Sequence, residues 1–102
     1  MYLDMMRVLE LPEYAQWVSG LRDRRAVARI EVRLNRVKLG NFGDVRSVGS
    51  GVSELKIDYG PGYRVYFTRR QDGTLVILLA GGTKKRQAAD IARAQALAAA
   101  LE

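Results

Sequence analysis

Two alternating segments joined by a Gly-Pro-Gly turn occupy residues 51–67, GVSELKIDYGPGYRVYF. A strand with one buried face needs an apolar residue at every second position. The residues that meet this requirement are Leu55, Ile57, Tyr63, Val65 and Phe67. The residues between them, Lys56 and Arg64, must then point to the opposite face. The sequence therefore predicts a hairpin whose open face carries two long cations, a surface suited to holding phosphate.

The charge balance of the chain is strongly basic. Its 102 residues include 17 Lys and Arg against 11 Asp and Glu, which gives a formal net charge of +6. In so small a protein this balance favours a polyanionic partner such as RNA, DNA, an anionic surface or an acidic protein. The alternative is a basic protein that is merely soluble. The length predicts one domain over residues 1–102, with room for one modest core.

Two residue types are missing, and their absence excludes several kinds of chemistry. Without cysteine there is no disulfide, no thiolate nucleophile and no cysteine zinc site. Without histidine the usual general base and the commonest metal ligand are also missing. The carboxylates are scattered over the predicted loops and strands, so we expect no metal and no cofactor. Any catalysis must use Lys, Arg, Tyr, Asp or Glu.

The hydropathy pattern favours a soluble cytoplasmic protein. The longest apolar run, residues 75–80, is far too short to span a membrane. Residues 1–7 contain no apolar segment of signal-peptide length.

The first part of the chain predicts a strand and two helices. Residues 2–11 read as an edge strand or extended lead-in that stops at Pro12, which suits the first turn of a helix. The apolar stripe of that helix is Tyr14, Trp17, Val18 and Leu21. Asp23 is placed to cap a second helix running to about Lys38. The predicted buried face of this second helix is Val27, Ile30, Leu34 and Val37.

A second stripe on the same helix is made of arginines. It consists of Arg22, Arg25, Arg29, Arg33 and Arg36. Like charges at these spacings destabilise a helix by roughly 0.2–0.5 kcal/mol per pair. The stripe is therefore either tolerated solvated surface or a docking face for an acidic partner.

The second part of the chain predicts a meander of short strands followed by a helix. The expected strands cover residues 45–48, 52–58, 63–69 and 74–80. Asp72-Gly73 is a strong hairpin signal, and the continuous apolar run of the last strand is typical of a central strand covered on both faces. Gly81 and Gly82 should close that strand, and Thr83 should cap the final helix. The predicted packing face of that helix is Ile91, Ala94, Ala98 and Leu101.

This order of elements predicts an α+β fold. Its antiparallel β-sheet carries two N-terminal helices and a C-terminal helix.

Lys56, Arg64 and Tyr66 form the first candidate site on the sheet. A guanidinium binds phosphate in bidentate fashion and stabilises charge that develops during phosphoryl transfer. Tyr66, two residues beyond Arg64 on the same face, can stack on a base or shuttle a proton. The alternative is an ordinary exposed strand face, where charged residues and tyrosine are common.

Lys84, Lys85 and Arg86 form the second candidate, at the start of the last helix. Backbone N–H groups at a helix N-terminus favour an anion, and three cations there oppose the helix dipole. An anionic ligand would resolve this conflict. The segment lacks the glycine spacing of a Walker loop, so nucleotide hydrolysis is not expected.

Several segments together resemble a known family. They are residues 40–49 (GNFGDVRSVG), 51–57 (GVSELKI), 60–67 (GPGYRVYF) and 78–87 (LLAGGTKKRQ). In order and spacing they resemble the RelE/ParE toxin superfamily and, more narrowly, its HigB-like addiction module killer proteins. The resemblance extends over nearly the whole chain and implies a RelE-like fold.

The resemblance also implies a function. Members are type II toxins neutralised by an antitoxin encoded beside them. RelE-like members cut mRNA, commonly in the ribosomal A site and without metal, through attack of the 2′-OH that leaves a 2′,3′-cyclic phosphate. We therefore expect a cytoplasmic endoribonuclease that inhibits translation and whose partners are mRNA and an antitoxin. An acidic antitoxin segment crossing the basic face would mask the site.

The resemblance assigns roles residue by residue. Arg64 falls at the family's strand arginine that contacts the scissile phosphate, and Lys56 falls at or near its strand lysines. Lys84 falls near the cationic position after the last strand. Some relatives use a histidine or tyrosine near the C-terminus, and this chain has neither beyond Tyr66. Under the endoribonuclease hypothesis that the resemblance implies, Lys56 or Tyr66 would act as the base and Lys84 or Lys85 as the acid. The expected phosphate- and RNA-binding residues are Arg46, Lys85 and Arg86.

Two alternatives remain open within the same superfamily. One is a non-enzymatic ParE-type inhibitor of DNA gyrase, for which the arginine stripe could serve. The other is an inactive toxin that only binds its antitoxin. Fold alone does not decide among these functions.

Overall fold

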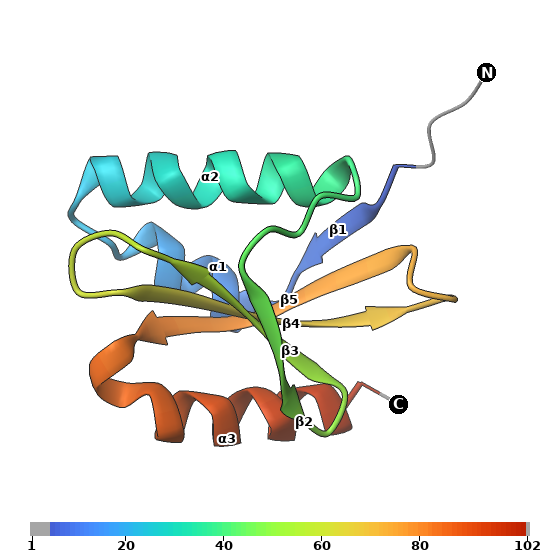
Figure 1. Ribbon diagram of the computed structural model, residues 1–102. Coiled ribbons are helices and arrows are strands. Elements are labelled where there is room, and N and C mark those ends of the chain that lie inside the picture. Colours follow the sequence, from blue (N-terminus) through green and yellow to red (C-terminus); the bar gives the residue numbers. More distant parts are fainter. Residues whose placement is uncertain (1–4, 102) are drawn as a thin grey trace.

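A computed structural model describes residues 5–101 of the chain (Figure 1). Within this range the elements follow one another as β1 (Arg7–Glu10), α1 (Pro12–Ser19), α2 (Arg24–Lys38), β2 (Val45–Gly49), β3 (Val52–Ile57), β4 (Tyr63–Arg70), β5 (Leu75–Thr83) and α3 (Gln87–Ala99). The strands form one sheet in the order β1-β5-β4-β3-β2. The expected edge strand is confirmed for β1, whereas residues 2–4 of that prediction lie outside the described residues. No helix in the described range is long and apolar enough to cross a membrane.

The sheet is antiparallel from β2 to β5, as the turn signals predict. Strand β1 departs from this pattern because it pairs parallel to β5, with Arg7 beside Leu75 and Glu10 beside Leu78. A parallel pair needs a long connection, and the chain from α1 to β4 supplies one. The predicted α+β class is confirmed, with the correction that the sheet is mixed at this edge.

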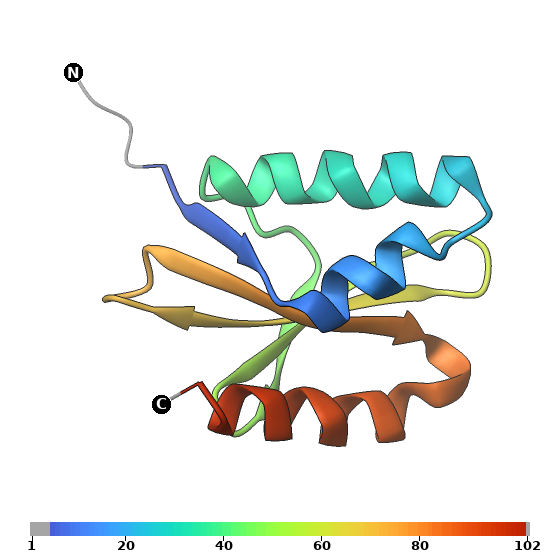
Figure 2. The same ribbon diagram turned by 180° about the vertical axis from the view of Figure 1, so that it is seen from behind.

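Helices cover both faces of the sheet. Figures 1 and 2 show α2 on one side and α3 on the other. The core on the first side joins Tyr14 of α1 and Ile30 of α2 to the predicted apolar face of β3 and β4. On the second side, Ala94 and Ala98 of α3 pack against Leu79 and Tyr66. The expectation that the last strand is covered on both faces is therefore confirmed.

The predicted starts of the first two helices are confirmed. Pro12 occupies the first turn of α1. The Asp23 carboxylate caps α2 by accepting hydrogen bonds from the backbone N–H groups of Arg25 (3.0 Å) and Ala26 (3.3 Å). Such a cap satisfies donors that the helix itself leaves without partners.

The predicted start of the last helix is wrong. Strand β5 continues to Thr83, which pairs with Tyr63, and a 3₁₀ turn over Lys84–Arg86 precedes α3. Thr83 makes no side-chain capping bond to any described residue. The reason is that β4 begins at Tyr63 and so offers β5 a partner beyond residue 80.

Gly81 and Gly82 serve as contact points within β5 rather than as its end. A Cβ atom on Gly81 would overlap the indole ring of Trp17, and one on Gly82 would overlap the carboxylate of Asp90. Glycine within a strand permits such close approach. These two residues therefore let α1 and α3 pack closely on the sheet.

We expect Gly81→Ala to lower the free energy of unfolding by about 1–3 kcal/mol, because the added methyl group must displace the Trp17 ring. Urea denaturation measures the change. Gly20→Ala is the matched control, since Gly20 has helical backbone angles (φ −86°) at the end of α1. That control should be neutral or stabilising by up to about 1 kcal/mol. Equal stability of the Gly81 variant and the wild type would contradict the packing argument.

Candidate functional site

A pocket of about 250 Å³ opens at the β3–β4 ladder. The strands pair Lys56 with Arg64 and Glu54 with Tyr66, so the predicted cross-strand pair of cations is confirmed. We call this cavity the phosphate pocket, after the ligand that the sequence predicts for this face of the sheet. Its lining residues are Asp44, Arg46, Glu54, Lys56, Arg64 and Gln87.

The prediction that this face of the sheet is open is wrong for two of its residues. Lys56 is exposed, but Arg64 is only 4% exposed and Tyr66 is 0% exposed. Tyr66 belongs to the core that also contains Ala94 and Ala98 of α3. Small side chains on α3 let that helix close over the sheet, and so Tyr66 cannot stack on a base in this structure.

Burial also fixes the protonation of Tyr66. Burial, with a further contribution from the nearby Glu54 carboxylate, raises the pKa of Tyr66 far above its ordinary value. At neutral pH the phenol therefore keeps its proton. Its hydroxyl oxygen has no hydrogen-bond partner among residues 5–101.

Glu54 lines this pocket but is absent from the predicted site residues, as are Asp44 and Gln87. It is 2% exposed. One carboxylate oxygen accepts a hydrogen bond from Nε of Arg46 (3.0 Å). The other accepts from Nε2 of Gln87 (2.8 Å) and lies 3.7 Å from Nε of Arg64. Glu54 thereby connects β3 to β2, to β4 and to the start of α3.

Glu54 stays ionised despite being buried. Burial alone would raise the pKa of its carboxyl, but the hydrogen bonds from Arg46 and Gln87 more than offset this, and its pKa lies below the ordinary value. A signal for its role exists in the sequence, because Glu54 alternates with Lys56 on one face of β3. That position puts a carboxylate beside the predicted cations.

Arg64 reaches the phosphate pocket with an unused donor. Its Nη1 donates to the carbonyl oxygen of Gly62 (2.9 Å), but its buried Nε has no hydrogen-bond partner among residues 5–101. Buried donors nearly always have partners. Because Arg64 also lines the pocket, an anion bound there is a natural acceptor for it.

Lys84 lies in the 3₁₀ turn before α3 and does not line the phosphate pocket, although it lies near Arg64 at Gly62. Its backbone N–H donates to the carbonyl oxygen of Gly62 (2.9 Å), the same oxygen that Arg64 contacts. A Cβ on Gly62 would lie 3.0 Å from Nη1 of Arg64 and 3.4 Å from Cβ of Lys84. Glycine at this point therefore lets the two cationic residues converge.

Lys85 and Arg86 are exposed beside Lys84 but do not line the phosphate pocket as the structure describes it. The three cations lie in the 3₁₀ turn that leads directly into α3, with Arg86 at the N-cap of α3, so they stand at the start of the last helix as predicted but precede its first α-helical turn.

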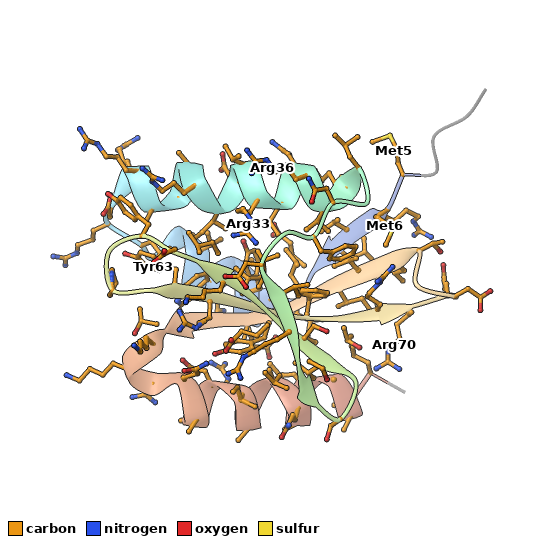
Figure 3. All side chains as sticks on the ribbon, viewed as in Figure 1. Met5, Met6, Arg33, Arg36, Tyr63 and Arg70 are labelled. Carbon is orange, nitrogen blue, oxygen red and sulfur yellow. The ribbon has the colours of Figure 1, made fainter. Side chains whose placement is uncertain are left out.

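Arg33 differs from the other arginines of its stripe. Its guanidinium donates to the backbone carbonyls of Phe42 (3.2 Å), Asp44 (3.4 Å) and Lys56. Figure 3 shows it between α2 and the loop that leads into β2. Burial lowers the pKa of Arg33, with the Asp44 carboxylate acting in the opposite direction. Arg33 thus ties α2 to two residues that line the phosphate pocket.

The phosphate pocket has more cations than carboxylates, because Asp44 and Glu54 are the acidic residues that line it, and this balance suits an anion. Arg46, Lys56 and Arg64 supply the positive charge, and the ionised Glu54 orients two of these three. Among residues 5–101, no three or more Asp, Glu, His or Cys side chains are grouped so as to hold a metal ion.

The lowered pKa of Glu54 makes stability depend on pH. Its contribution is fully present above the ordinary pKa of 4.5 and is lost as the pH falls through the lower folded-state value. We expect the wild type to lose stability below about pH 4.5 and Glu54→Gln to lose less over the same range. Chemical denaturation at a series of pH values measures both.

The difference between these two proteins isolates Glu54. Burial raises the pKa of Asp90, so its effect on the pH dependence of stability is opposite to that of Glu54. Asp90 is present in both proteins, and its effect therefore cancels in the comparison. If the difference in free energy of unfolding between the wild type and Glu54→Gln does not change with pH, then Glu54 is not a buried, ionised carboxylate.

Comparison with other proteins finds relatives both by sequence and by structure. No protein-family model matches the sequence. An uncharacterized protein of Haemophilus influenzae is 51% identical over 85 residues, which cover 83% of this chain and 85% of that protein. A mutant of the E. coli toxin RelE in the free state superposes with a TM-score of 0.72, covering 90% of this chain and 95% of that chain at 12% identity. At this identity the likeness shows the fold, and the fold is RelE-like.

Proposed function

We propose from its RelE-like fold that this chain, which belongs to the same family as the uncharacterized Haemophilus influenzae protein, is the toxin of a type II toxin–antitoxin system. We propose further that it is a HigB-like endoribonuclease. In this proposal it cleaves mRNA on the ribosome without a metal ion and so inhibits translation in the cytoplasm.

The observation that carries the proposal is the unused donor of Arg64. The buried Nε of Arg64 lies 3.7 Å from a Glu54 oxygen and makes no hydrogen bond to residues 5–101, so an acceptor with several oxygens in the pocket would supply the missing bond. A phosphodiester meets this need, because guanidinium groups bind phosphate through parallel hydrogen bonds.

The proposed reaction is a transfer of the phosphoryl group within the RNA. The 2′-oxygen loses its proton and bonds to the adjacent phosphorus while the bond from phosphorus to the 5′-oxygen breaks. The 5′-oxygen takes up a proton, and the products are a 2′,3′-cyclic phosphate and a 5′-hydroxyl. Negative charge accumulates on the phosphate oxygens in the transition state, where fixed cations are most effective.

In this proposal Arg64 on β4 stabilises that charge, together with Lys56 on the adjacent β3 and Arg46 on β2. Glu54 acts as a positioning residue for Arg46 and Arg64, because both of its oxygens are occupied by contacts within the protein. Tyr66 does not suit the role of base, since it is buried and its pKa is raised. Lys56 is then the proposed base and Lys84 or Lys85 the proposed acid, with Arg86 as a further contact to RNA.

The proposed protein partner is an antitoxin. Type II toxins are held inactive by such a partner, and the net charge of +6 favours one with an acidic surface.

We expect Lys56→Ala to reduce mRNA cleavage by about 10²-fold or more, as loss of a transition-state contact does elsewhere. Because Lys56 is exposed, the variant should fold normally. Lys38→Ala is the matched control, an exposed lysine at the end of α2, and it should cleave like the wild type. Primer extension on mRNA after brief induction in cells detects the new 5′ ends.

Arg64→Lys tests the bidentate contact with the positive charge retained. It too should lose cleavage, and thermal unfolding checks that it folds. Unchanged cleavage by both the Lys56 and the Arg64 variants would refute the proposed site. Growth arrest with intact mRNA would instead favour gyrase inhibition, and no arrest at all would indicate an inactive toxin.

A further inference from the structure

Strand β1 forms one edge of the sheet, and half of its backbone groups face away from β5. In the sheet order β1-β5-β4-β3-β2, β5 is its neighbour within residues 5–101. The N–H groups of Arg7 and Leu11 donate to carbonyl oxygens of β5, each over 2.9 Å. Because successive residues of a strand direct their backbone groups to opposite edges, those of Val8 and Glu10 point outward. They form a short template for a further strand.

The opposite edge of the sheet, β2, is protected against such pairing. A register shift between Ser47 and Gly49 interrupts its ladder with β3. Nε2 of Gln95 on α3 donates to the carbonyl oxygen of Val48 (2.9 Å). A bulge and a covering helix are two common means of protecting an edge strand. The ladder of β1 with β5 is regular from end to end, so β1 is the edge suited to pairing.

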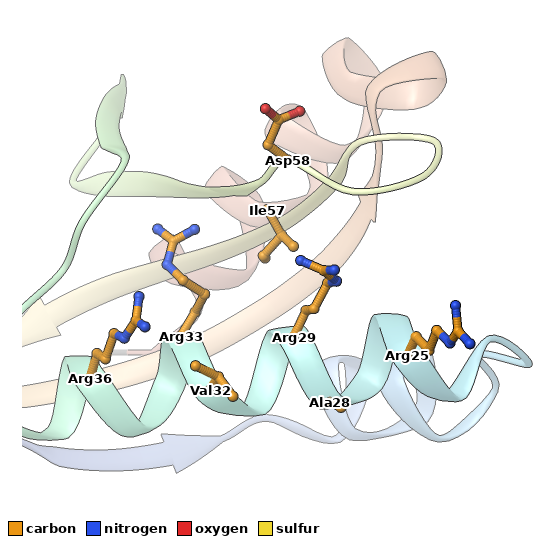
Figure 4. Close-up of a pocket in the computed structure, with 8 residues that line it drawn as sticks. All are labelled: Arg25, Ala28, Arg29, Val32, Arg33, Arg36, Ile57 and Asp58. Atoms are coloured by element: carbon orange, nitrogen blue, oxygen red, sulfur yellow. The ribbon is translucent and has the colours of Figure 1, made fainter.

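Exposed apolar side chains gather at the β1 edge. Those of large size among residues 5–101 are Met5, Leu9, Val32 and Leu39. Met5 and Leu9 belong to β1 and its lead-in, and Leu39 lies next to the end of α2 that bonds to the start of β1. Val32 lies apart from them, in a groove of α2 lined by arginines (Figure 4). Exposed apolar surface concentrated in one place marks a contact with another protein.

The charges at this edge are balanced, unlike those of the whole chain. The chain has a net charge of +6, so two copies repel each other over most of their surface. Near β1, Arg7 and Lys38 are matched by Glu10 and Glu31, and a groove of about 290 Å³ between β1 and α2 is lined by all of these but Arg7. No ion pair within residues 5–101 engages any of the four. A second copy can therefore approach here without net repulsion.

The register of such a pairing is restricted. Two equal strands that pair antiparallel about a twofold axis must set outward-facing residues opposite each other. With the axis at Leu9, Val8 of each copy faces Glu10 of the other, and every outward N–H group meets an outward carbonyl. An axis at Val8 would need the N–H of Met6, which already donates to the carbonyl oxygen of Lys38 (2.8 Å). The axis at Leu9 also sets the two exposed Leu9 side chains directly opposite each other.

This register brings opposite charges together. Lys38 lies beside Met6, since the two share a backbone hydrogen bond. Within one copy Glu10 is four residues from Met6, or about 13 Å along the strand. Across the axis, Glu10 of the second copy is a diagonal neighbour of Met6, about 7–8 Å away. Each Lys38 is therefore nearer to Glu10 of the other copy than to its own, and the twofold axis repeats the pair.

We propose that two copies of this chain associate through β1, antiparallel and about a twofold axis at Leu9. The two five-stranded sheets then join into one continuous sheet. Because β1 has only 4 residues, the interface is small and the dimer is weak and reversible. The dimer goes beyond the proposed ribonuclease reaction and does not depend on it. Strands β5 and β4 separate β1 from β3, which carries Lys56 of the phosphate pocket.

Analytical ultracentrifugation of the full chain over a range of concentrations measures the association. We expect the mass to rise reversibly from one copy toward two as the concentration increases. Hydrogen exchange of the backbone amides locates the contact. The amides of Val8 and Glu10 should exchange more slowly in the dimer, whereas those of Arg7 and Leu11 are bonded to β5 in both states and should not change. Neither measurement uses RNA, so a failure here is read separately from a failure of the proposed ribonuclease.

Leu9→Lys and Val32→Lys form a matched pair of variants. The two side chains are almost equally exposed, at 47% and 48%, and both changes add one positive charge. Only Leu9 lies on the proposed axis, where the change sets two cations opposite each other. We expect Leu9→Lys to weaken the dimer by about tenfold or more and Val32→Lys to weaken it by less than about threefold.

Glu10→Lys, Lys38→Glu and the double variant test the pair between copies. Each single change sets like charges together at two symmetric places and should weaken the dimer about three- to tenfold. The double variant exchanges the charges and should return to within about twofold of the wild type. Arg36→Glu is the control, because Arg36 is exposed in the last turn of α2 like Lys38 but does not line the groove beside β1. It should change the association by less than about twofold.

A mass that stays at one copy at every concentration would overturn the proposal and leave the β1 edge to an extended segment of another protein. Equal weakening by the Leu9 and Val32 variants would overturn it too. So would a dimer in which the amides of Val8 and Glu10 exchange as fast as in the monomer, because its contact would then lie elsewhere. A double variant that associates no better than the single variants would refute the pairing of Glu10 with Lys38 and, with it, the axis at Leu9.

Discussion

The buried carboxylate of Glu54 requires a fixed set of hydrogen-bond donors and cations around it, and much of the fold depends on this requirement. An ionised group removed from water costs several kcal/mol unless charged or hydrogen-bonding partners surround it. Here the partners come from three other elements, because Arg46 lies on β2, Arg64 on β4 and Gln87 at the start of α3. When α3 packs on the sheet, it places the side chain of Gln87 beside the Glu54 carboxylate. The same requirement that joins the elements also holds Arg46 and Arg64 on the wall of one pocket.

Much of the fold is predictable because its signals are local. The alternation in residues 51–67 identifies β3 and β4, and the short turn between them fixes their register, so Lys56 and Arg64 are opposite each other. The cap at Asp23 and the proline at position 12 are likewise read from a few neighbouring residues. The end of β5 was mispredicted because Gly81-Gly82 is a common strand breaker. The pairing with β4, a distant contact, outweighs that local preference.

The candidate site is less predictable, because its properties arise between elements. No periodicity shows that α3 covers Arg64 and Tyr66, and so their burial was missed. Arg33 has the same spacing as its neighbours in the arginine stripe. It differs only because the loop carrying Phe42 and Asp44 passes within reach of its guanidinium. Three-dimensional context thus separates one structural arginine from residues that sequence spacing treats as equivalent.

The parallel pairing of β1 with β5 has a consequence for how the chain folds. Arg7 and Val8 meet Leu75 and Val76, so the ends of a very long loop must be brought together. Contacts between residues so distant in sequence form slowly, because the entropy of closing the loop is lost before the contact stabilises the chain. During synthesis, β1 has no partner until β5 has left the ribosome, whereas α1 and α2 depend mainly on nearby residues. The order in which the chain is made therefore leaves its first strand to be incorporated among the last.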